Sequence, residues 1–189
     1  RKASKDMKKV PLRMVRALGS LLEREGKVAE AKTLYEAYLT AHPASRLINY
    51  ELKRLETGKV ARPIAVDAAS GFAEGMFNLA SALPLNRAAA AALLYARIAA
   101  YLKPKFPVAQ LLMGDIFDIN RRYGDSIAIY RTIALDSPYS WLARLKMAEN
   151  LNNTDRVDEA KVILEALATE RPTDIEPLLQ LGRFLRVRE

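Results

Sequence analysis

The sequence lacks cysteine and has a single histidine, His42, among its 189 residues. Without cysteine there are no disulfides, thiolate metal sites or cysteine nucleophiles. His42 has no second imidazole to share a zinc site with, and we interpret it as a loop residue because it lies in an Ala-His-Pro turn. No glycine-rich phosphate-binding motif of the G-x-x-x-x-G-K or G-x-G-x-x-G type is present. We therefore expect no enzyme, no cofactor and no small-molecule substrate.

Long hydrophobic runs are also missing. The longest, Ala88–Ala96, has nine residues, whereas a membrane-spanning helix needs about 20. The composition, 50% hydrophobic and 28% charged, is typical of a folded soluble protein. Its alanine-rich, cysteine-free character suggests a bacterial protein of the cytoplasm or periplasm. The sequence begins at Arg1 and stops inside a helical pattern at Glu189, so we expect a piece of a longer protein.

The net charge of +8 is concentrated at the two ends of the chain. Residues 1–16 carry seven basic side chains and one acidic side chain, and residues 183–189 carry three arginines and one glutamate. A nucleic-acid reader is expected to carry positive charge along its binding face, so the neutral central part disfavours nucleic acid as a partner. The basic leader, residues 1–11, is either a solvated segment or a weak contact for an anionic membrane surface.

A 34-residue period is the strongest positive signal. Pro104, Pro138 and Pro172 are spaced by this step, and each follows a helix-like stretch. Proline cannot continue a helix and biases the preceding residue away from helical angles. A fixed period of this length predicts pairs of short amphipathic helices that bury their apolar faces by stacking on neighbouring pairs.

Within each period the small and large residues recur in phase. A large, a small and a second large residue lie on the first helix, and a small residue lies on the second helix, followed four positions later by tyrosine in two units. The first-helix sets are Leu18/Gly19/Leu22, Leu79/Ala80/Leu83, Met113/Gly114/Phe117, Met147/Ala148/Leu151 and Leu181/Gly182/Leu185, and the second-helix residues are Ala31 with Tyr35, Ala92, Ser126 with Tyr130, and Ala160. Small residues allow helix axes to approach to about 8 Å.

These residues resemble the tetratricopeptide repeat family. The resemblance implies an all-α, right-handed superhelical solenoid of antiparallel helix pairs. It also implies a non-catalytic scaffold that binds another protein, as a peptide or helix, in a concave groove. The expected segments are the leader 1–11, repeats at 12–45, 73–106, 107–140 and 141–174, a degenerate repeat at 46–72, and a half repeat at 175–189 that holds only a first helix.

The 34-residue spacing is interrupted in the degenerate repeat at 46–72. Residues 46–57 form an amphipathic pattern that Gly58 should end. Pro63 and Gly71 are poor inside helices, so we expect a shortened or irregular connection over about 58–70. One interpretation is a degenerate second helix. The other is a kink, or an insert that plugs or borders the groove.

The resemblance also implies groove positions on the first helix of each unit. One position per unit forms a first row, in which Arg16 is followed by an apolar stripe. This stripe is either exposed for a partner, or packed against neighbouring side chains or against a continuation of the chain. Its residues are Phe77, Leu111, Leu145 and Leu179. The expected groove residues are Phe77, Ser81, Leu111, Asp115, Asp118, Leu145, Glu149, Leu179 and Arg183. The polar groove positions are acidic in the middle units. The ligand that fits them best is therefore an apolar or helical segment with some positive charge.

Two other functions remain open at this point. The chain could be a structural repeat segment of a larger enzyme or of a secretion or assembly machine, with its groove filled internally. It could also be a helical-repeat RNA binder, which would need basic residues along the groove, where this sequence has Asp115, Asp118 and Glu149.

Overall fold

The computed structural model describes residues 7–186, and in that range all regular secondary structure is helical, from α2 to α11. The expected all-α helical-repeat fold is confirmed. The chain divides into two compact units, Arg1–Gly71 and Phe72–Glu189. Residues 1–6 of the predicted leader and 187–189 of the predicted half repeat lie outside the described range.

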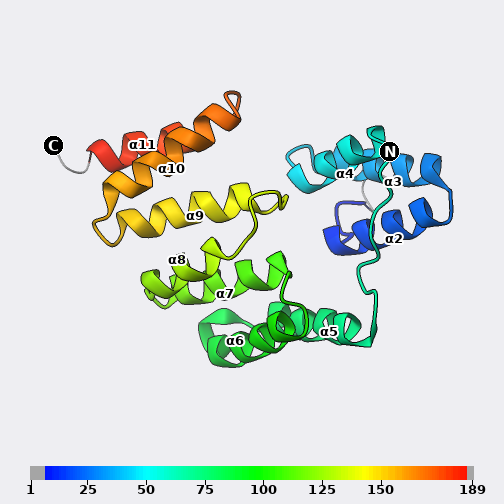
Figure 1. Cartoon of the computed structure of the whole chain (residues 1–189), viewed down its shortest axis with the longest axis horizontal. Helices are drawn as coiled ribbons and strands as arrows, with labels where there is room; N and C mark the ends of the chain where they lie inside the picture. Colours follow the sequence, from blue (N-terminus) through cyan, green and yellow to red (C-terminus); the bar gives the residue numbers. More distant parts are fainter. Residues whose placement is uncertain (1–6, 187–189) are drawn as a thin grey trace. The chain divides into compact units, whose positions relative to one another are not determined.

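The first unit contains the helices α2 (Leu12–Arg24), α3 (Val28–Ala41) and α4 (Arg46–Glu56). Each packs on the next along the chain (Figure 1). Gly26 and Gly58, at φ +77° and +70°, follow α2 and α4 and adopt the left-handed conformation that ends helices. The buried core of the unit consists of Val15, Ala31, Tyr35, Tyr38 and Ile48.

No helix follows α4 until α5 (Ala68–Ala82) begins, so residues 57–67 take the place of a second helix. The start of α5 is fixed by its own side chains. The Asp67 carboxylate accepts the Ser70 N–H at 2.7 Å, and the Ser70 hydroxyl accepts the Val66 N–H at 2.9 Å. Such a carboxylate satisfies one of the free donors at a helix N-terminus.

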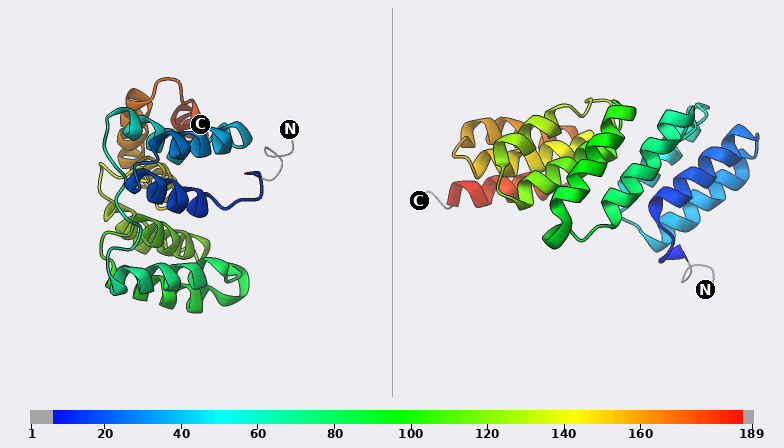
Figure 2. Two further views of the ribbon diagram at one scale, coloured as in Figure 1. Left: turned by 90° about the vertical axis from the view of Figure 1, so that its right-hand side faces the viewer. Right: turned by 90° about the horizontal axis from the view of Figure 1, so that it is seen from below.

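The second unit takes up most of α5 and continues through six more helices. They are α6 (Leu85–Leu102), α7 (Pro107–Ile119), α8 (Tyr123–Arg131), α9 (Ser140–Asn152), α10 (Val157–Glu170) and α11 (Glu176–Arg186). From α6 onward each helix contacts the next, and α9 also contacts α11 (Figure 2). We call α5, α7, α9 and α11 the A helices and α6, α8 and α10 the B helices. In the first unit, α2 and α4 are A helices and α3 is a B helix.

In α2 and α7 the small residue lies directly beneath the following B helix. A Cβ atom added at Gly114 of α7 would come within 2.2 Å of the Tyr130 ring of α8, and one at Gly19 of α2 within 2.3 Å of Tyr35 of α3. The Ser126 hydroxyl, one turn before Tyr130, donates to the Gly114 carbonyl at 2.9 Å. The glycine and the tyrosine four residues after a small residue therefore form one packing unit.

Leu18 and Leu79, the first large residues of two expected packing sets, are more exposed than the sequence pattern predicts. Leu18 is 48% and Leu79 is 51% exposed, whereas the equivalent Met113 is 7% exposed. Met113 packs with Ala80 of α5 and Ala96 of α6, which belong to the preceding helix pair. Among the described residues, α2 follows no helix pair and α5 follows the non-helical segment. Burial at this position therefore depends on the preceding pair and not on the leucine itself.

Candidate functional site

The nine predicted groove residues all lie in the second unit, at equivalent places on the A helices. We call them the A-helix row. α5 carries Phe77 and Ser81, α7 carries Leu111, Asp115 and Asp118, α9 carries Leu145 and Glu149, and α11 carries Leu179 and Arg183.

Three of the four apolar members of the row belong to the core. Phe77, Leu111 and Leu145 are each 8% exposed, whereas Leu179 is 52% exposed. Phe77 packs against Phe106 with ring centroids 5.4 Å apart, and Leu111 and Leu145 belong to the largest hydrophobic cluster of the unit. Packing against neighbours, the alternative to an exposed stripe, therefore describes these three side chains, because adjacent helices cover them.

This difference predicts opposite effects for two glutamate substitutions. Leu145→Glu would bury a charge without a partner, so we expect the unit to lose about 3 kcal/mol or more of stability. Leu179→Glu places its charge in solvent and should change stability by less than about 0.5 kcal/mol. Denaturation followed by the fluorescence of Trp141, which is buried in this unit, measures both. Equal and small effects would show that Leu145 is not a core residue.

The polar members gather around α7 and α9. Asp115 accepts the Tyr130 hydroxyl at 2.6 Å and is paired with Lys146 of α9 at 2.9 Å. Burial raises the pKa of Asp118; the Asp115 carboxylate adds to the rise, while Lys146 and a hydrogen bond from Asn150 oppose it. An undersolvated carboxylate is stabilised by any further hydrogen-bond donor that reaches it.

The other polar members of the row are not joined to this group by any described interaction. Glu149 is exposed. The Ser81 hydroxyl donates to the Asn78 carbonyl of its own helix at 3.0 Å, and Arg183 lies 3.3 Å from Glu176, also on its own helix. The structure thus places a carboxylate-rich surface on α7 and α9 and a basic side chain on α11.

A second arrangement, which the sequence did not reveal, lies in the first unit. The side chain of Glu23, at the end of α2, has no solvent exposure. It accepts a two-pronged hydrogen bond from Arg54 of α4 at 2.6 and 2.7 Å, the Tyr35 hydroxyl at 2.9 Å and the Ala61 N–H at 2.8 Å. One buried carboxylate therefore ties α3, α4 and the non-helical segment to α2.

The residues that Glu23 holds are part of an extended stretch, Lys59 to Arg62, which we call the strap. The Ser20 hydroxyl donates to the Arg62 carbonyl at 3.1 Å, and Arg54 donates to the Lys59 carbonyl. Glu51 completes the charge network by accepting Arg16 at 2.8 Å and Arg54 at 3.0 Å. The strap is thus bound through its backbone by side chains of two A helices.

Opposing effects set the pKa of Glu23. Burial alone would raise it, but the hydrogen bonds from Arg54, Ala61 and Tyr35 outweigh burial, so the pKa of Glu23 lies below its ordinary value. Burial and the bond to Glu23 raise the pKa of Tyr35. The pKa of Arg54 is also raised, because its bonds to Glu23 and Glu51 outweigh its own desolvation. Glu23 is thus held as a carboxylate at neutral pH.

The two arrangements occupy equivalent places. Counted from the glycine beneath the tyrosine, Ser20 and Glu23 lie one and four residues beyond Gly19, and Asp115 and Asp118 lie one and four residues beyond Gly114. The signal that could have revealed Glu23 is this register, because the prediction counted Asp118 but not the equivalent acid four residues after Gly19.

Comparison with known families agrees with the helix-pair architecture. The tetratricopeptide repeat family model matches residues 17–45 and 142–174. Two segments of the chain, one in each unit, are therefore similar to tetratricopeptide repeats. A crystal structure of a thermophilic TPR protein from Thermus thermophilus is similar, with 21% identity over 89% of this chain and 95% of that chain and a TM-score of 0.47. The comparison with curated proteins gives no match.

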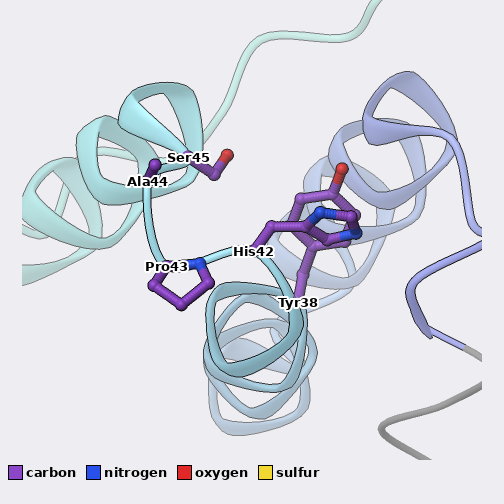
Figure 3. Close-up of a pocket in the computed structure, with 5 residues that line it drawn as sticks. All are labelled: Tyr38, His42, Pro43, Ala44 and Ser45. Atoms are coloured by element: carbon purple, nitrogen blue, oxygen red, sulfur yellow. The ribbon is translucent and has the colours of Figure 1, made fainter.

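The first tetratricopeptide repeat holds the predicted loop histidine. The His42 ring stacks on Tyr38 with centroids 4.3 Å apart (Figure 3). The His42 Nε2 atom lies 3.3 Å from the Met7 carbonyl. It borders an open surface depression of about 320 Å³ with Pro43, Ala44 and Ser45. The lining contains no Asp, Glu, Lys, Arg or Cys side chain beside His42, so the depression brings together no acid, base and nucleophile.

Two further kinds of site are absent from the described part of the repeats. Residues 7–186 contain no group of three or more His, Cys, Asp or Glu side chains that could hold a metal ion. No helix in the same range is long and apolar enough to cross a membrane. Tetratricopeptide repeats are generally non-catalytic scaffolds for protein–protein interactions, and this chain has the repeat architecture of such a scaffold.

Proposed function

We propose that the polar part of the A-helix row in the second unit binds an extended, positively charged segment of a partner protein. One observation carries the proposal. In the first unit, side chains at the equivalent A-helix positions already bind an extended segment, the strap, through its backbone. The strap carries two basic residues, Lys59 and Arg62. A similar ligand from another chain would use the same chemistry.

The side chains of the row supply the required acceptors. Glu23 accepts the backbone N–H of Ala61, and Asp118 is the equivalent carboxylate in the second unit. Asp118 is partly buried, and burial raises its pKa, so a donated N–H would stabilise its charged form. Asp115 lies one turn earlier on α7 and Glu149 is exposed on α9, and both can pair with lysine or arginine. Exposed pairs contribute only about 0.2–1 kcal/mol each, so selectivity depends on several of them together.

The charge of the row weighs against the RNA-binding alternative. A phosphate backbone would be repelled by the carboxylates of Asp115, Asp118 and Glu149. The nearby Lys146 is already paired with Asp115. The internal-occupant alternative has support from the strap, which shows that this chain can fill an A-helix face with its own backbone. A partner remains the stronger proposal for the second unit, because Asp118 is partly exposed there and the neighbours that act on its carboxylate are the side chains of Lys146, Asp115 and Asn150.

A peptide selection tests the proposal. Random peptides displayed on phage and selected on the protein should become enriched in arginine and lysine. The double variant Asp118→Asn, Glu149→Gln should bind the selected peptides at least about tenfold more weakly, since a hydrogen bond to a charged group is worth about 1.5–3 kcal/mol.

The matched control is Asp158→Asn with Glu165→Gln, which removes two exposed charges from α10 and should leave affinity unchanged. Selection of neutral or acidic peptides, or equal loss in both double variants, would refute the proposal. Binding of a single-stranded RNA oligonucleotide in preference to peptide would favour the RNA alternative instead.

A further inference from the structure

The helix α6 lies in the longest part of the sequence that has no acidic residue. Residues 75–114 contain no Asp or Glu, but they contain the four basic residues Arg87, Arg97, Lys103 and Lys105. Of these, Arg87, Arg97 and Lys105 are exposed. The charged side chains of α6 and of the residues that flank it are therefore positive only, in contrast to the acidic part of the A-helix row.

One side of α6 is buried and the other is exposed. Ala92, Ala96 and Ala99 are fully buried, and Ala96 packs with Ala80 of α5 and Met113 of α7. The exposed side, which we call the outer stripe of α6, repeats with helical spacing. Its residues are Ala90, Ala91, Leu94, Arg97 and Tyr101.

Two large side chains of the outer stripe lie in solvent. Leu94 is 57% and Tyr101 is 83% exposed. Arg97, which lies between them, is placed over the Phe117 ring of α7, 6.0 Å from the ring centroid. Among the described residues it contacts this ring and forms no ion pair with a carboxylate. Arginine and tyrosine are enriched among the residues that dominate protein–protein interfaces, so the stripe has the composition of an interface.

The other B helices carry carboxylates at the equivalent positions. Counted from the buried small residue of each B helix, these are Glu30 and Glu36 of α3, Asp125 of α8, and Asp158, Glu159 and Glu165 of α10. All six are exposed. This side stays open on α8 although that helix packs on both α7 and α9, so the stacking of helix pairs does not cover it. The outer stripe of α6 differs from its counterparts in composition, because it has apolar and basic residues where they have acids.

The outer stripe has the shape and the donor that suit a second helix. Ala90 and Ala91 are small, and small side chains allow two helix axes to approach to about 8 Å. Arginine only donates hydrogen bonds, so a helix on the stripe must bring an acceptor to Arg97. A carboxylate makes the strongest such pair.

An anionic lipid surface is the other occupant that the positive charge would suit. A helix that lies in a membrane surface carries its large apolar residues on one face and its basic residues on the opposite, polar face. Here Arg97 lies between Leu94 and Tyr101 on the same stripe. A protein surface, which can place a carboxylate between two apolar contacts, therefore fits the stripe better than a membrane does.

We infer that the outer stripe of α6 binds an acidic amphipathic helix of a partner protein. The apolar side of that helix packs on Ala90, Leu94 and Tyr101, and its carboxylates pair with Arg97. The inference is independent of the proposed function, because the outer stripe belongs to a B helix and shares no residue with the A-helix row.

A second copy of this chain fits the stripe less well. Its most acidic helix is α10, but Glu159 is already paired with Arg156 at 2.6 Å, and Glu165 with Lys161 at 3.8 Å. The equivalent exposed stripe of α10 offers Val162 as its one large apolar residue. A different protein is therefore the better occupant.

A library of folded helices tests the inference. A stable helical bundle with one randomised helix face is displayed on phage and selected on the whole chain, so that no helix has to fold on binding. Selected clones should combine aspartate or glutamate with large apolar residues at helical spacing. Isothermal titration calorimetry then measures the binding of the purified clones.

Variants of the outer stripe locate the site. Leu94→Ser, Tyr101→Ser and Arg97→Glu should each weaken binding at least about tenfold, as expected for central interface residues. The matched controls, in the same register on α10 and α8, are Val162→Ser and Arg131→Glu, and they should leave affinity unchanged. Clones with lysine in place of their acids should bind Arg97→Glu more tightly than the unchanged protein.

Several results would overturn the inference. The first is a selection that enriches no clones, or only neutral or basic ones, or clones that bind the stripe variants and the controls equally. Binding to vesicles of phosphatidylcholine and phosphatidylserine that depends on Leu94 and Arg97 would make a lipid surface the occupant, and stripe-dependent self-association in sedimentation would make it a second copy. A lower unfolding midpoint for Tyr101→Ser, followed by Trp141 fluorescence, would show that the chain itself covers the stripe.

Discussion

Gly114→Ala is expected to destabilise the second unit by about 1–3 kcal/mol, while Gly75→Ala stabilises it by about 0.5–1 kcal/mol. The two glycines lie inside A helices of the same unit and differ in what lies above them. A Cβ atom at position 114 would come within 2.2 Å of the Tyr130 ring, whereas one at position 75 meets nothing within 4 Å. The first substitution forces a buried ring to move, and the second removes only the conformational freedom of glycine.

Unfolding in urea, followed by Trp141 fluorescence, measures this pair of substitutions. The single tryptophan is 3% exposed and lies in the second unit, so its signal reports that unit. Moving Tyr130 also disturbs its hydrogen bond to Asp115, which adds to the loss. Equal midpoints for the two variants would contradict the close packing of Tyr130 on Gly114.

Glu23→Ala is expected to destabilise the first unit by about 3–5 kcal/mol, because it leaves Arg54 buried without its main partner. The Ala61 N–H and the Tyr35 hydroxyl also lose their acceptor. The exposed glutamate Glu25, which pairs with Lys27, is the control, and Glu25→Gln should have no clear effect. Circular dichroism follows the unfolding, and an unchanged Trp141 transition would place the loss in the first unit.

Lowering the pH should protonate the Glu23 carboxylate and remove its contribution to stability. The pKa of Glu23 is lowered in the folded protein, so its contribution is fully present above the ordinary glutamate pKa of about 4.3 and is lost as pH falls through the lower folded value. The stability difference between the unchanged protein and Glu23→Gln should therefore shrink below about pH 4. A difference that grows with acid would contradict the assigned direction.

The repeat pattern predicted the architecture, because the 34-residue period and the positions of the glycines are found in the sequence alone. The helical stretch that Gly58 should end corresponds to α4, which stops at Glu56. Burial was harder to predict. Leu145 and Leu179 occupy the same place in the 34-residue period, yet they are 8% and 52% exposed, since their exposure depends on which neighbouring helices cover them.

The strap could not be predicted, because its contacts join residues far apart in the sequence. Glu23 lies in the run Glu-Arg-Glu-Gly, which has the composition of a solvated helix end. Only the fold brings Ala61, 38 residues later, to its carboxylate. The sequence predicts an irregular connection over about 58–70, and one interpretation of it is an insert that borders the groove. The sequence does not indicate which residues hold this segment.

A nuclear magnetic resonance titration with a selected basic peptide tests the central claim, that A-helix positions of the second unit bind an extended chain as those of the first unit bind the strap. We expect amide shifts around Asp115, Asp118 and Glu149, new protection of peptide backbone amides, and an unchanged Ala61 amide, because the strap already occupies its own site. Shifts confined to the B helices α8 and α10, or loss of Ala61 protection on binding, would contradict the account.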